Sequence, residues 1–259
     1  MRVALLSDIH GNTLALDAVL ADVEKLGGVD AYWVLGDLAA IGYDPVGCLE
    51  RLIALPNVEI IRGNTDRYLV TGERPPPSLA QCEANPALWP IRAEVAVSFA
   101  WTQGVVTRDS WLDWLAELPL DKRFQLPDGT QVLCVHASPG NDDGPGFTPE
   151  TSRDTLAAYL ADGQADLICV GHTHWPQIAE LEEGKIVNLG SISNAFAPDI
   201  RASYLFLTAD ENGYQLEHRR VDYDHQAVIA ALQRVRHPTP EYIITFMRGE
   251  HYPPWVRNR

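Results

Sequence analysis

The chain has 259 residues, of which 46% are hydrophobic, and carries a formal net charge of -15. This length and apolar content allow one sizeable globular domain with a core of its own. The negative charge argues against non-specific binding to duplex nucleic acid, because such binding needs cationic side chains to replace phosphate counterions. A small anionic substrate is compatible with it, since bound divalent cations reverse the local sign of the charge.

The N-terminal apolar run Val3–Leu6 is too short for the core of a signal peptide, and no later stretch approaches the length of a membrane span. We therefore expect a soluble, cytoplasmic protein with no membrane partner. We also expect buried free thiols, because Cys134 and Cys169 lie inside apolar runs; a disulfide is possible but unneeded at this chain length. The four cysteines, which form no CxxC pair, are Cys48, Cys82, Cys134 and Cys169.

Short apolar runs alternate with helical patterns over the first seventy residues. The expected strands are Val3–Leu6, Tyr32–Leu35 and Val58–Ile61. Helices are expected between them, from Asn12 or Thr13 to about Leu26 and from Asp44-Pro45 to about Leu55. This alternation predicts a mostly parallel sheet, in which ligands gather where the carboxyl ends of the strands open into loops. The segments at those ends are Asp8-Ile9-His10-Gly11-Asn12, Gly36-Asp37 and Gly63-Asn64.

A tryptophan-bearing segment interrupts this pattern after the stiff loop Pro75-Pro76-Pro77. Helices are expected at about Ala87–Gln103 and Ser110–Glu117. We interpret residues 74–120 as a helical cap insertion in a single domain that spans residues 1–259. The insertion is expected to pack over the sheet, to form one wall of the substrate pocket, or to do both.

Strand patterns return in the second half of the chain. The expected strands are Arg123–Gln125, Val132–Val135, Leu167–Val170, Ile178–Leu181, Ile186–Leu189, Ser203–Thr208 and Tyr214–Val221. A glycine-rich acidic loop spans Asn141–Gly146, and a helix is expected from Thr148 to about Leu160. Residues 222–259 are expected to form a closing helix, Asp224–Arg236, and a tail that is irregular from His237 onward.

Seven polar side chains at predicted strand ends have the chemistry of metal ligands. Carboxylates can bridge two cations, an amide offers a neutral oxygen, and imidazoles suit Zn, Fe, Ni and, with carboxylates, Mn. Each fragment alone is weak, because a single histidine after a strand is more often a structural residue. Five fragments in one order, all at strand ends, are specific as a set. The seven are Asp8, His10, Asp37, Asn64, His136, His172 and His174.

The series DxH, GD, GN, H and GHTH, from about Val3 to Leu189, resembles the calcineurin-like metallophosphoesterase superfamily, and most closely its small bacterial and archaeal phosphodiesterase-like branch. The resemblance implies an α/β (α+β) fold of four αββα layers, in which two sheets pack face to face with helices outside. It also implies metal assignments. Asp8, His10 and His174 would hold one divalent ion, and Asn64, His136 and His172 a second, while Asp37 and a water or hydroxide would bridge them.

The function implied is hydrolysis of a phosphoester or phosphoanhydride by a metal-bridging hydroxide, with Asp37, Asn64 and His136 as catalytic residues. Manganese is the favoured metal, with Fe, Ni, Co or Zn as alternatives. The substrate would be a small phosphorylated molecule, such as a nucleotide. Its candidate contacts are Asn12, Arg62 and Asp66, although an arginine beside a loop usually forms a surface ion pair, and a loop carboxylate such as Asp66 can instead cap backbone amides.

One departure from the family pattern narrows the function. Many relatives carry a histidine directly after the GN pair, where it protonates the leaving oxygen, but here Thr65 stands at that position. Loss of a general acid favours good leaving groups such as phosphoanhydrides and aryl esters. A phosphodiesterase or a nucleotide-directed phosphatase is therefore expected. The alternatives are a dinucleoside polyphosphate hydrolase and a non-catalytic binding scaffold of the same fold. No feature indicates an oligomeric state.

Overall fold

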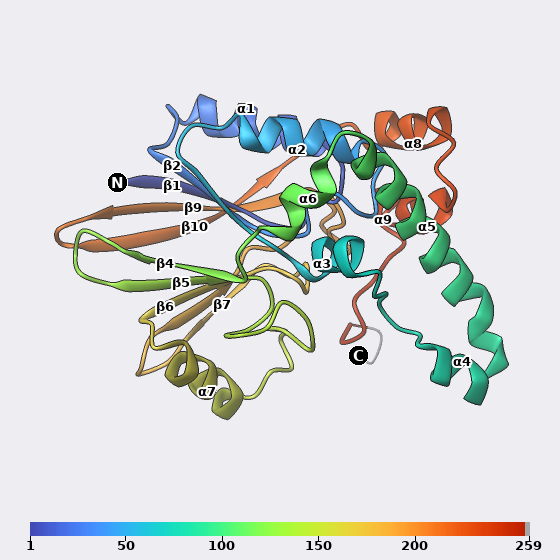
Figure 1. Cartoon of the computed structure of the whole chain (residues 1–259). Helices are drawn as coiled ribbons and strands as arrows, with labels where there is room; N and C mark the ends of the chain where they lie inside the picture. The colour runs from blue at the N-terminus through green and yellow to red at the C-terminus, as the bar shows by residue number, and fades with distance from the viewer. Residues whose placement is uncertain (257–259) are drawn as a thin grey trace.

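Two five-stranded sheets pack face to face in the computed structural model, which describes residues 1–256 (Figure 1). The strands of the first sheet are β1 (Arg2–Leu6), β2 (Ala31–Leu35), β3 (Val58–Ile61), β9 (Ala202–Asp210) and β10 (Gly213–Val221). Those of the second are β4 (Asp121–Gln125), β5 (Gln131–Val135), β6 (Leu167–Val170), β7 (Gln177–Glu180) and β8 (Lys185–Asn188). The strand orders are β10-β9-β1-β2-β3 and β4-β5-β6-β8-β7.

Parallel strands form one part of each sheet. In the first sheet β1, β2 and β3 run parallel, and β9 and β10 extend the sheet antiparallel. In the second, β5, β6 and β8 run parallel between antiparallel edge strands. The prediction of parallel pairing is therefore confirmed for the strands that precede the motif loops. Their carboxyl ends carry all the predicted metal ligands.

Helices form the two outer layers, so the predicted αββα order is confirmed (Figure 1). Helices α1 (Thr13–Lys25) and α2 (Pro45–Ile53) cover the first sheet, and α7 (Arg153–Gly163) covers the second. The remaining helices are α3 (Asn64–Thr71), α4 (Leu79–Ala84), α5 (Trp89–Arg108), α6 (Trp111–Ala116), α8 (His225–Arg234) and α9 (Pro240–Met247). Not one of the helices in the described part of the chain is both long and apolar enough to span a membrane.

Alternating side chains fill separate cores on the two faces of each sheet. Val3 and Leu5 face the second sheet, whereas Ala4 and Leu6 face the helices over the first. Between the sheets, the ring of Trp33 on β2 stacks on Phe124 of β4 with a centroid separation of 3.9 Å. All four cysteines are free and buried, as predicted. The apolar interface between the two sheets holds them in one relative position and so brings their loop ends together.

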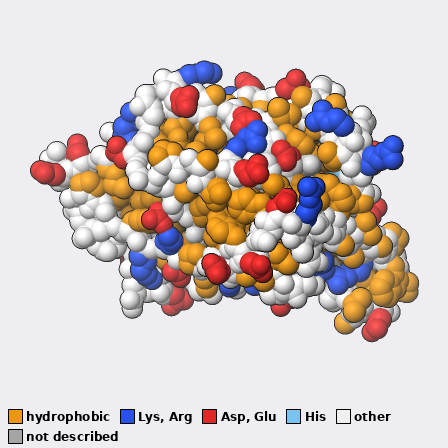
Figure 2. Space-filling view, turned by 45° about the horizontal axis from the view of Figure 1, so that its top comes forward, with side chains coloured by type: hydrophobic (Ala, Val, Ile, Leu, Met, Phe, Trp, Pro, Cys, Tyr) orange, Lys and Arg blue, Asp and Glu red, His pale blue; other side chains and the backbone are white. Residues whose placement is uncertain are grey.

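Part of the segment predicted as a cap insertion, α4 and much of α5, projects from one end of the sandwich, whereas α6 lies close to the sheets (Figure 1). The segment consists of α4, a 3-10 turn at Pro86–Leu88, α5 and α6. Both α5 and α6 contact α3, the helix that begins at Asn64. Several apolar side chains of the segment are exposed, and Figure 2 shows hydrophobic surface at the end of the molecule where α4 and α5 lie. They are Leu79, Trp89, Ile91 and Val97.

Two sequence expectations about helices were wrong. The helix expected from Thr148 begins at Arg153, because the Ser152 side chain accepts a hydrogen bond from the Thr155 N–H and caps it there. The tail expected to be irregular contains α9, whose proline at the first turn and apolar face pack it against α8. The final residues of the predicted tail, 257–259, lie outside the described part of the chain.

Candidate metal centre

Loops at the carboxyl ends of five strands bring the seven predicted ligands together. Asp8 and His10 follow β1, Asp37 follows β2, and Asn64 begins α3 just after β3. From the second sheet, His136 follows β5, and His172 and His174 follow β6. Five of the seven have positive φ, between 47° and 67°, which non-glycine residues seldom adopt. Strained backbone of this kind occurs mostly at functional sites. The five are Asp8, His10, Asp37, His172 and His174.

One group of ligand atoms gathers around Asp8. Its Oδ1 lies 3.1 Å from His174 Nε2 and 3.9 Å from His10 Nε2. The two ring nitrogens are 3.2 Å apart. Asp8 and His10 have exposed fractions of 0% and 1%, whereas the His174 side chain is 14% exposed, so the group is open to solvent only at His174. These atoms are close enough together to bind one ion.

A second group gathers around Asn64. Its Oδ1 lies 3.1 Å from His136 Nε2 and 2.9 Å from His172 Nδ1. Asp37 lies between the two groups, with Oδ1 3.4 Å from His136 Nε2 and Oδ2 3.7 Å from His10 Nε2. Asp8, Asp37 and His136 also lie close enough to share an ion, so the candidate groups overlap.

Backbone carbonyls orient all four imidazoles. In each ring the outer nitrogen faces a carbonyl oxygen at 2.6 to 3.0 Å, which favours a proton on that nitrogen. The inner nitrogen of the neutral ring then presents a lone pair to the cluster. The outer contacts are His10 Nδ1 with Ala40, His136 Nδ1 with Leu35, His172 Nε2 with Gly144 and His174 Nδ1 with Asn194.

The atoms of the cluster are better placed to bind a divalent cation than to form hydrogen bonds with one another. With neutral rings, the lone pairs of His10 and His174 face each other, and Asn64 Oδ1 faces two more acceptors. Asp8 Oδ1 is buried and receives no hydrogen bond from any described residue, whereas Asp8 Oδ2 accepts from Ser7 Oγ. A buried carboxylate oxygen without a donor is costly unless a positive charge compensates it. Carboxylate, amide and imidazole ligands suit a divalent transition metal.

The charges of the site are tightly coupled. Burial opposes ionisation of Asp8 and Asp37, but the neighbouring imidazoles hold the pKa of both carboxyls below the usual range. Burial alone would lower the pKa of His136, yet the Asp37 and Asp8 carboxylates raise it to about 10. The pKa of His174 is likewise raised against burial by Asp8, whereas burial lowers the pKa of His10 and His172. Without a cation, a proton on His136 therefore offsets part of the carboxylate charge.

Asp66 adopts the amide-capping arrangement that was the alternative to a substrate contact. It is fully buried, and its oxygens accept hydrogen bonds from the backbone N–H groups of Asp37, Leu38 and Gly63 at 2.8 to 3.0 Å. Burial and the Asp37 carboxylate raise its pKa to about 7. Asp66 therefore ties the Asp37 loop to the Asn64 loop.

The other two substrate candidates also have structural partners. Asn12 has an exposed fraction of 1%, and its Oδ1 caps α1 by accepting from the Ala15 N–H at 3.1 Å. Arg62 Nε donates to Asp142 at 2.8 Å, and Arg67 Nε donates to the same carboxylate at 2.9 Å. Arg62 therefore forms an ion pair, which was the alternative to a substrate contact. The arginines therefore fix the Asn141–Gly146 loop, whose Gly144 carbonyl orients His172.

Sequence reasoning missed the residues that orient the ligands, because they act through backbone carbonyls that carry no residue signature. Asn194 O, which faces His174, belongs to a buried loop after β8. The same loop places the Phe196 ring 5.9 Å from the ring of His174. The available signal was the set of small polar residues Ser191, Ser193 and Asn194 after a strand.

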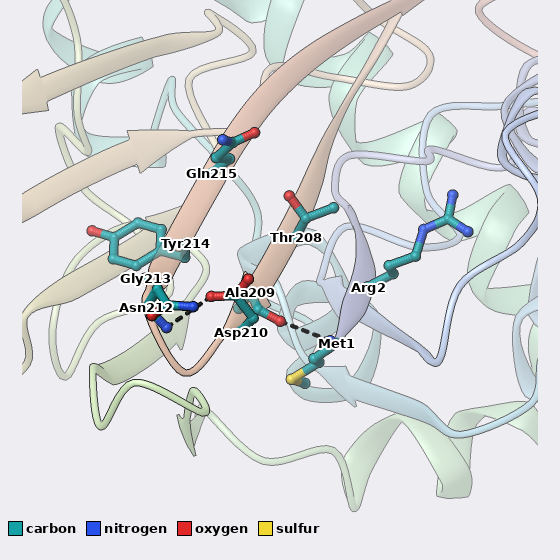
Figure 3. Close-up of a pocket in the computed structure, with 9 residues that line it drawn as sticks. All are labelled: Met1, Arg2, Thr208, Ala209, Asp210, Asn212, Gly213, Tyr214 and Gln215. Carbon is teal, nitrogen blue, oxygen red and sulfur yellow. Dashed lines mark hydrogen bonds between the residues drawn. The ribbon is translucent and has the colours of Figure 1, made fainter.

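A separate hollow of about 510 Å³ lies at the opposite end of the first sheet, between the chain start and the β9–β10 turn (Figure 3). The Met1 amino group donates to the Ala209 carbonyl there at 2.7 Å. Asp210 is the only acidic side chain of the lining, and its Oδ1 accepts from the Asn212 N–H. No described histidine or cysteine lines it, and both groups of potential metal ligands found among the described residues lie at the other end of the strands.

Three comparisons with known proteins agree with this geometry. The calcineurin-like phosphoesterase superfamily domain matches residues 1–212. An uncharacterized protein of Methanocaldococcus jannaschii is 30% identical over 258 residues, covering 93% of this chain and 95% of that protein. The crystal structure of a metallophosphoesterase from Sphaerobacter thermophilus aligns with a TM-score of 0.73 at 25% identity, covering 96% of this chain and 100% of that chain.

A more distant relative is a symmetrical bis(5'-nucleosyl)-tetraphosphatase from Acidovorax sp., 29% identical over 171 residues. The match covers 64% of this chain and 52% of that enzyme, so the chain spans about half the length of this relative. The family match covers most of the chain, including every candidate ligand. The chain therefore belongs to the calcineurin-like phosphoesterase superfamily and is a metal-dependent phosphoric ester hydrolase.

Proposed function

We propose that the chain is a dinuclear-metal phosphoesterase that hydrolyses phosphodiester or phosphoanhydride bonds of small phosphorylated substrates, nucleotides in particular. The position of Asp37 carries this proposal. Its two oxygens face different ligand groups, at 3.7 Å from His10 Nε2 and 3.4 Å from His136 Nε2. A single carboxylate between two such groups is the arrangement that a pair of cations needs.

The proposed ligands divide into two sets that share Asp37. Asp8, His10 and His174 would hold one cation, and Asn64, His136 and His172 the other. Manganese is the favoured metal, with Fe, Ni, Co or Zn as alternatives. When bound, such cations acidify water to supply a nucleophile near neutral pH and offset negative charge on the phosphoryl oxygens.

The residues around the ligands keep this arrangement rigid. The Thr65 N–H donates to Asp37 Oδ1 at 2.9 Å, and the His172 N–H donates to Asp8 Oδ2 at 3.1 Å. Each carboxylate thus keeps one orientation, which lowers the reorganisation cost of binding and catalysis. Thr65 itself offers no acidic proton near pH 7 to a departing alkoxide. The proposal therefore favours leaving groups that are stable as anions.

Phosphoanhydrides meet that requirement, because the leaving group is itself a phosphate. A dinucleoside polyphosphate hydrolase is the second candidate, and the relationship to the symmetrical bis(5'-nucleosyl)-tetraphosphatase favours it. The two candidates share the centre and the chemistry, and differ only in what the substrate carries beyond the scissile bond. A non-catalytic scaffold of this fold would bind a ligand without turnover.

A substrate and metal panel tests the proposal. Metal-stripped protein would be assayed with added Mn²⁺, Ni²⁺, Mg²⁺ or Zn²⁺ against an aryl phosphodiester, an aryl phosphomonoester and diadenosine tetraphosphate. We expect turnover to require a divalent ion, and Asp37→Ala to lower it by about 10³-fold or more. Asp17→Ala, which removes a half-exposed carboxylate on α1, is the matched control. Full activity without metal, or in Asp37→Ala, would refute the mechanism.

A further inference from the structure

A pocket beside the candidate metal ligand His174 is lined by a positively charged side chain, Arg220, which has no role in the function proposed above. The pocket is small, about 40 Å³, and it opens to solvent, so a phosphate group would lie at its mouth with the rest of the ligand outside. Arg220, near the end of β10, lines this pocket together with His174, Trp175, Phe196 and Asp199. Alternate residues of a strand share a face, so Arg220 lies on the same side of β10 as Leu216, which packs between the sheets.

Arg220 is only weakly paired. Its Nε lies 3.8 Å from Asp199 Oδ2, and its guanidinium group makes no hydrogen bond to residues 1–256. Asp199 is already engaged by Arg201, which donates to its two oxygens at 2.8 and 2.7 Å. Two guanidinium groups thus share one carboxylate, and the closer hydrogen bonds of that carboxylate go to Arg201. An arginine with unused donors is well suited to bind a phosphate in a bidentate manner.

Other arginines near the site or on the same strand differ from Arg220. Arg62 and Arg67 hydrogen-bond to the buried Asp142. Arg219, the neighbour of Arg220 on the opposite face of β10, pairs with Asp22 and Glu217. In a chain with a net charge of -15, an arginine that has no hydrogen-bond acceptor among residues 1–256 and lies beside a candidate metal ligand marks a place for an anion.

We propose that Arg220 binds the phosphate next to the scissile one, so that the preferred substrate is a nucleoside polyphosphate. The inference rests on the proposed function, because it takes the scissile phosphate to lie at the metal centre. His174 belongs to that centre and also lines the Arg220 pocket, so adjacent phosphates can reach both. Trp175 and Phe196 line the same pocket, where the Phe196 ring stacks on His251 and gives the pocket an apolar wall.

Steady-state kinetics and ADP binding test this assignment. Manganese-loaded wild-type protein, Arg220→Gln and Arg220→Lys would be compared on diadenosine tetraphosphate and on bis(p-nitrophenyl) phosphate, and ADP affinity would be measured by calorimetry. We expect Arg220→Gln to raise the KM for the tetraphosphate and the Kd for ADP about tenfold to a hundredfold. For the aryl diester, which has one phosphate, KM should rise less than about threefold. Arg220→Lys keeps the charge but not the planar fork of donors. We expect its increases in KM and Kd to be about half those of Arg220→Gln on a logarithmic scale.

Arg219→Gln is the matched control, because it removes the same charge from the adjacent position on the opposite face. We expect it to match wild type in both KM values and in ADP affinity. Equal effects of Arg219→Gln and Arg220→Gln on ADP affinity would overturn the inference. So would a wild-type protein that hydrolyses the aryl diester but binds no ADP, while leaving the proposed phosphoesterase function intact. If Arg220→Gln does not fold, Arg220→Lys decides the question by the same criteria.

Discussion

The two sheets contribute different chemistry to the candidate metal centre. The loops of the first sheet supply every candidate oxygen ligand and one imidazole, whereas those of the second supply three imidazoles and no carboxylate. The first set is Asp8, His10, Asp37 and Asn64, and the second is His136, His172 and His174. Each candidate three-residue group takes members from both sheets. The centre therefore exists only when the sheets pack, and metal binding should be linked to that packing.

The sheets also hold each other's ligands in place. The Leu35 carbonyl, at the end of β2, lies 2.6 Å from His136 Nδ1 of the second sheet. In the other direction, the His172 N–H donates to Asp8 Oδ2 of the first. Small shifts of one sheet end therefore move ligands of both groups. A substitution at the contact between the ends of β1 and β6 is therefore the most direct way to disrupt the candidate metal centre.

Among substitutions that leave every candidate ligand in place, Gly171→Ala should have the largest effect. A Cβ at this position would lie 1.9 Å from Ser7 Oγ and 2.5 Å from Asp8 Oδ2, so the carboxylate must move. We expect turnover to fall at least about a hundredfold and the free energy of unfolding to fall by about 1–3 kcal/mol. Turnover with Mn²⁺ and urea denaturation would measure the two effects.

Gly104→Ala is the control for that substitution. Gly104 lies within α5, and a Cβ there would have no neighbour within 4 Å. We expect unchanged turnover and a gain in stability of about 0.5–1 kcal/mol, since alanine favours the helix. If Gly171→Ala retained wild-type turnover, close contact between the sheet ends would not be a requirement of the centre.

Metal affinity should rise with pH, because protons on the second sheet compete with the cation. The pKa of His136 is raised to about 10, so this ring is protonated at neutral pH without metal and must lose its proton on binding. One released proton makes the apparent affinity rise about tenfold per pH unit below that pKa. Calorimetric Mn²⁺ titrations in buffers of different ionisation enthalpy count the protons released.

Two single substitutions sharpen this test. His136→Asn should reduce the number of protons released at neutral pH by about one. His172→Asn should leave that number unchanged, because burial lowers the pKa of His172 and its ring is neutral beforehand. Identical proton release in the two variants would show that the carboxylates of the first sheet do not hold a proton on His136.

Asp142→Asn should weaken the second sheet's side of the centre without touching a ligand. Asp142 accepts hydrogen bonds from Arg62 and Arg67 and fixes the loop whose Gly144 carbonyl orients His172. Loss of such support typically costs metal affinity, here about tenfold. Equilibrium dialysis with Mn²⁺ would measure the loss, and Asp142→Glu should restore part of it. Asp17→Asn, at the half-exposed Arg51 pair, should leave metal affinity unchanged.

The sequence was most informative where residue type and chemistry coincide. The strands before Asp8, Asp37, Asn64, His136 and His172 were predictable, because buried strands are continuous apolar runs that end at glycine or at a polar residue. The roles of Asp66, Asn12 and Arg62 could not be chosen, since one side chain caps an amide or contacts a substrate with the same atoms. Helix α9 was missed because Pro240 at its first turn was interpreted as part of an irregular tail.

Substitution of His237 is the last and smallest perturbation. This residue lies outside both sheets and gives a reference for the pH dependence of stability. Burial lowers its pKa to about 4, its Nδ1 accepts a hydrogen bond from the Thr239 N–H, and its ring packs edge-on against Trp101. A depressed pKa in the folded state means that the unfolded chain binds the proton more readily. Stability from this group is therefore complete above about pH 6.5 and declines as the pH falls toward 4.

His237→Asn keeps an acceptor for Thr239 but cannot titrate. Between about pH 6.5 and 4.5, wild type should lose about 1–2 kcal/mol more stability than the variant. Urea denaturation in the presence of a chelator would measure this difference, and titration of the metal-site histidines cancels because both proteins contain them. Parallel stability curves for the two proteins would instead attribute all acid sensitivity to the metal centre, and would place that sensitivity at the junction of the two sheets.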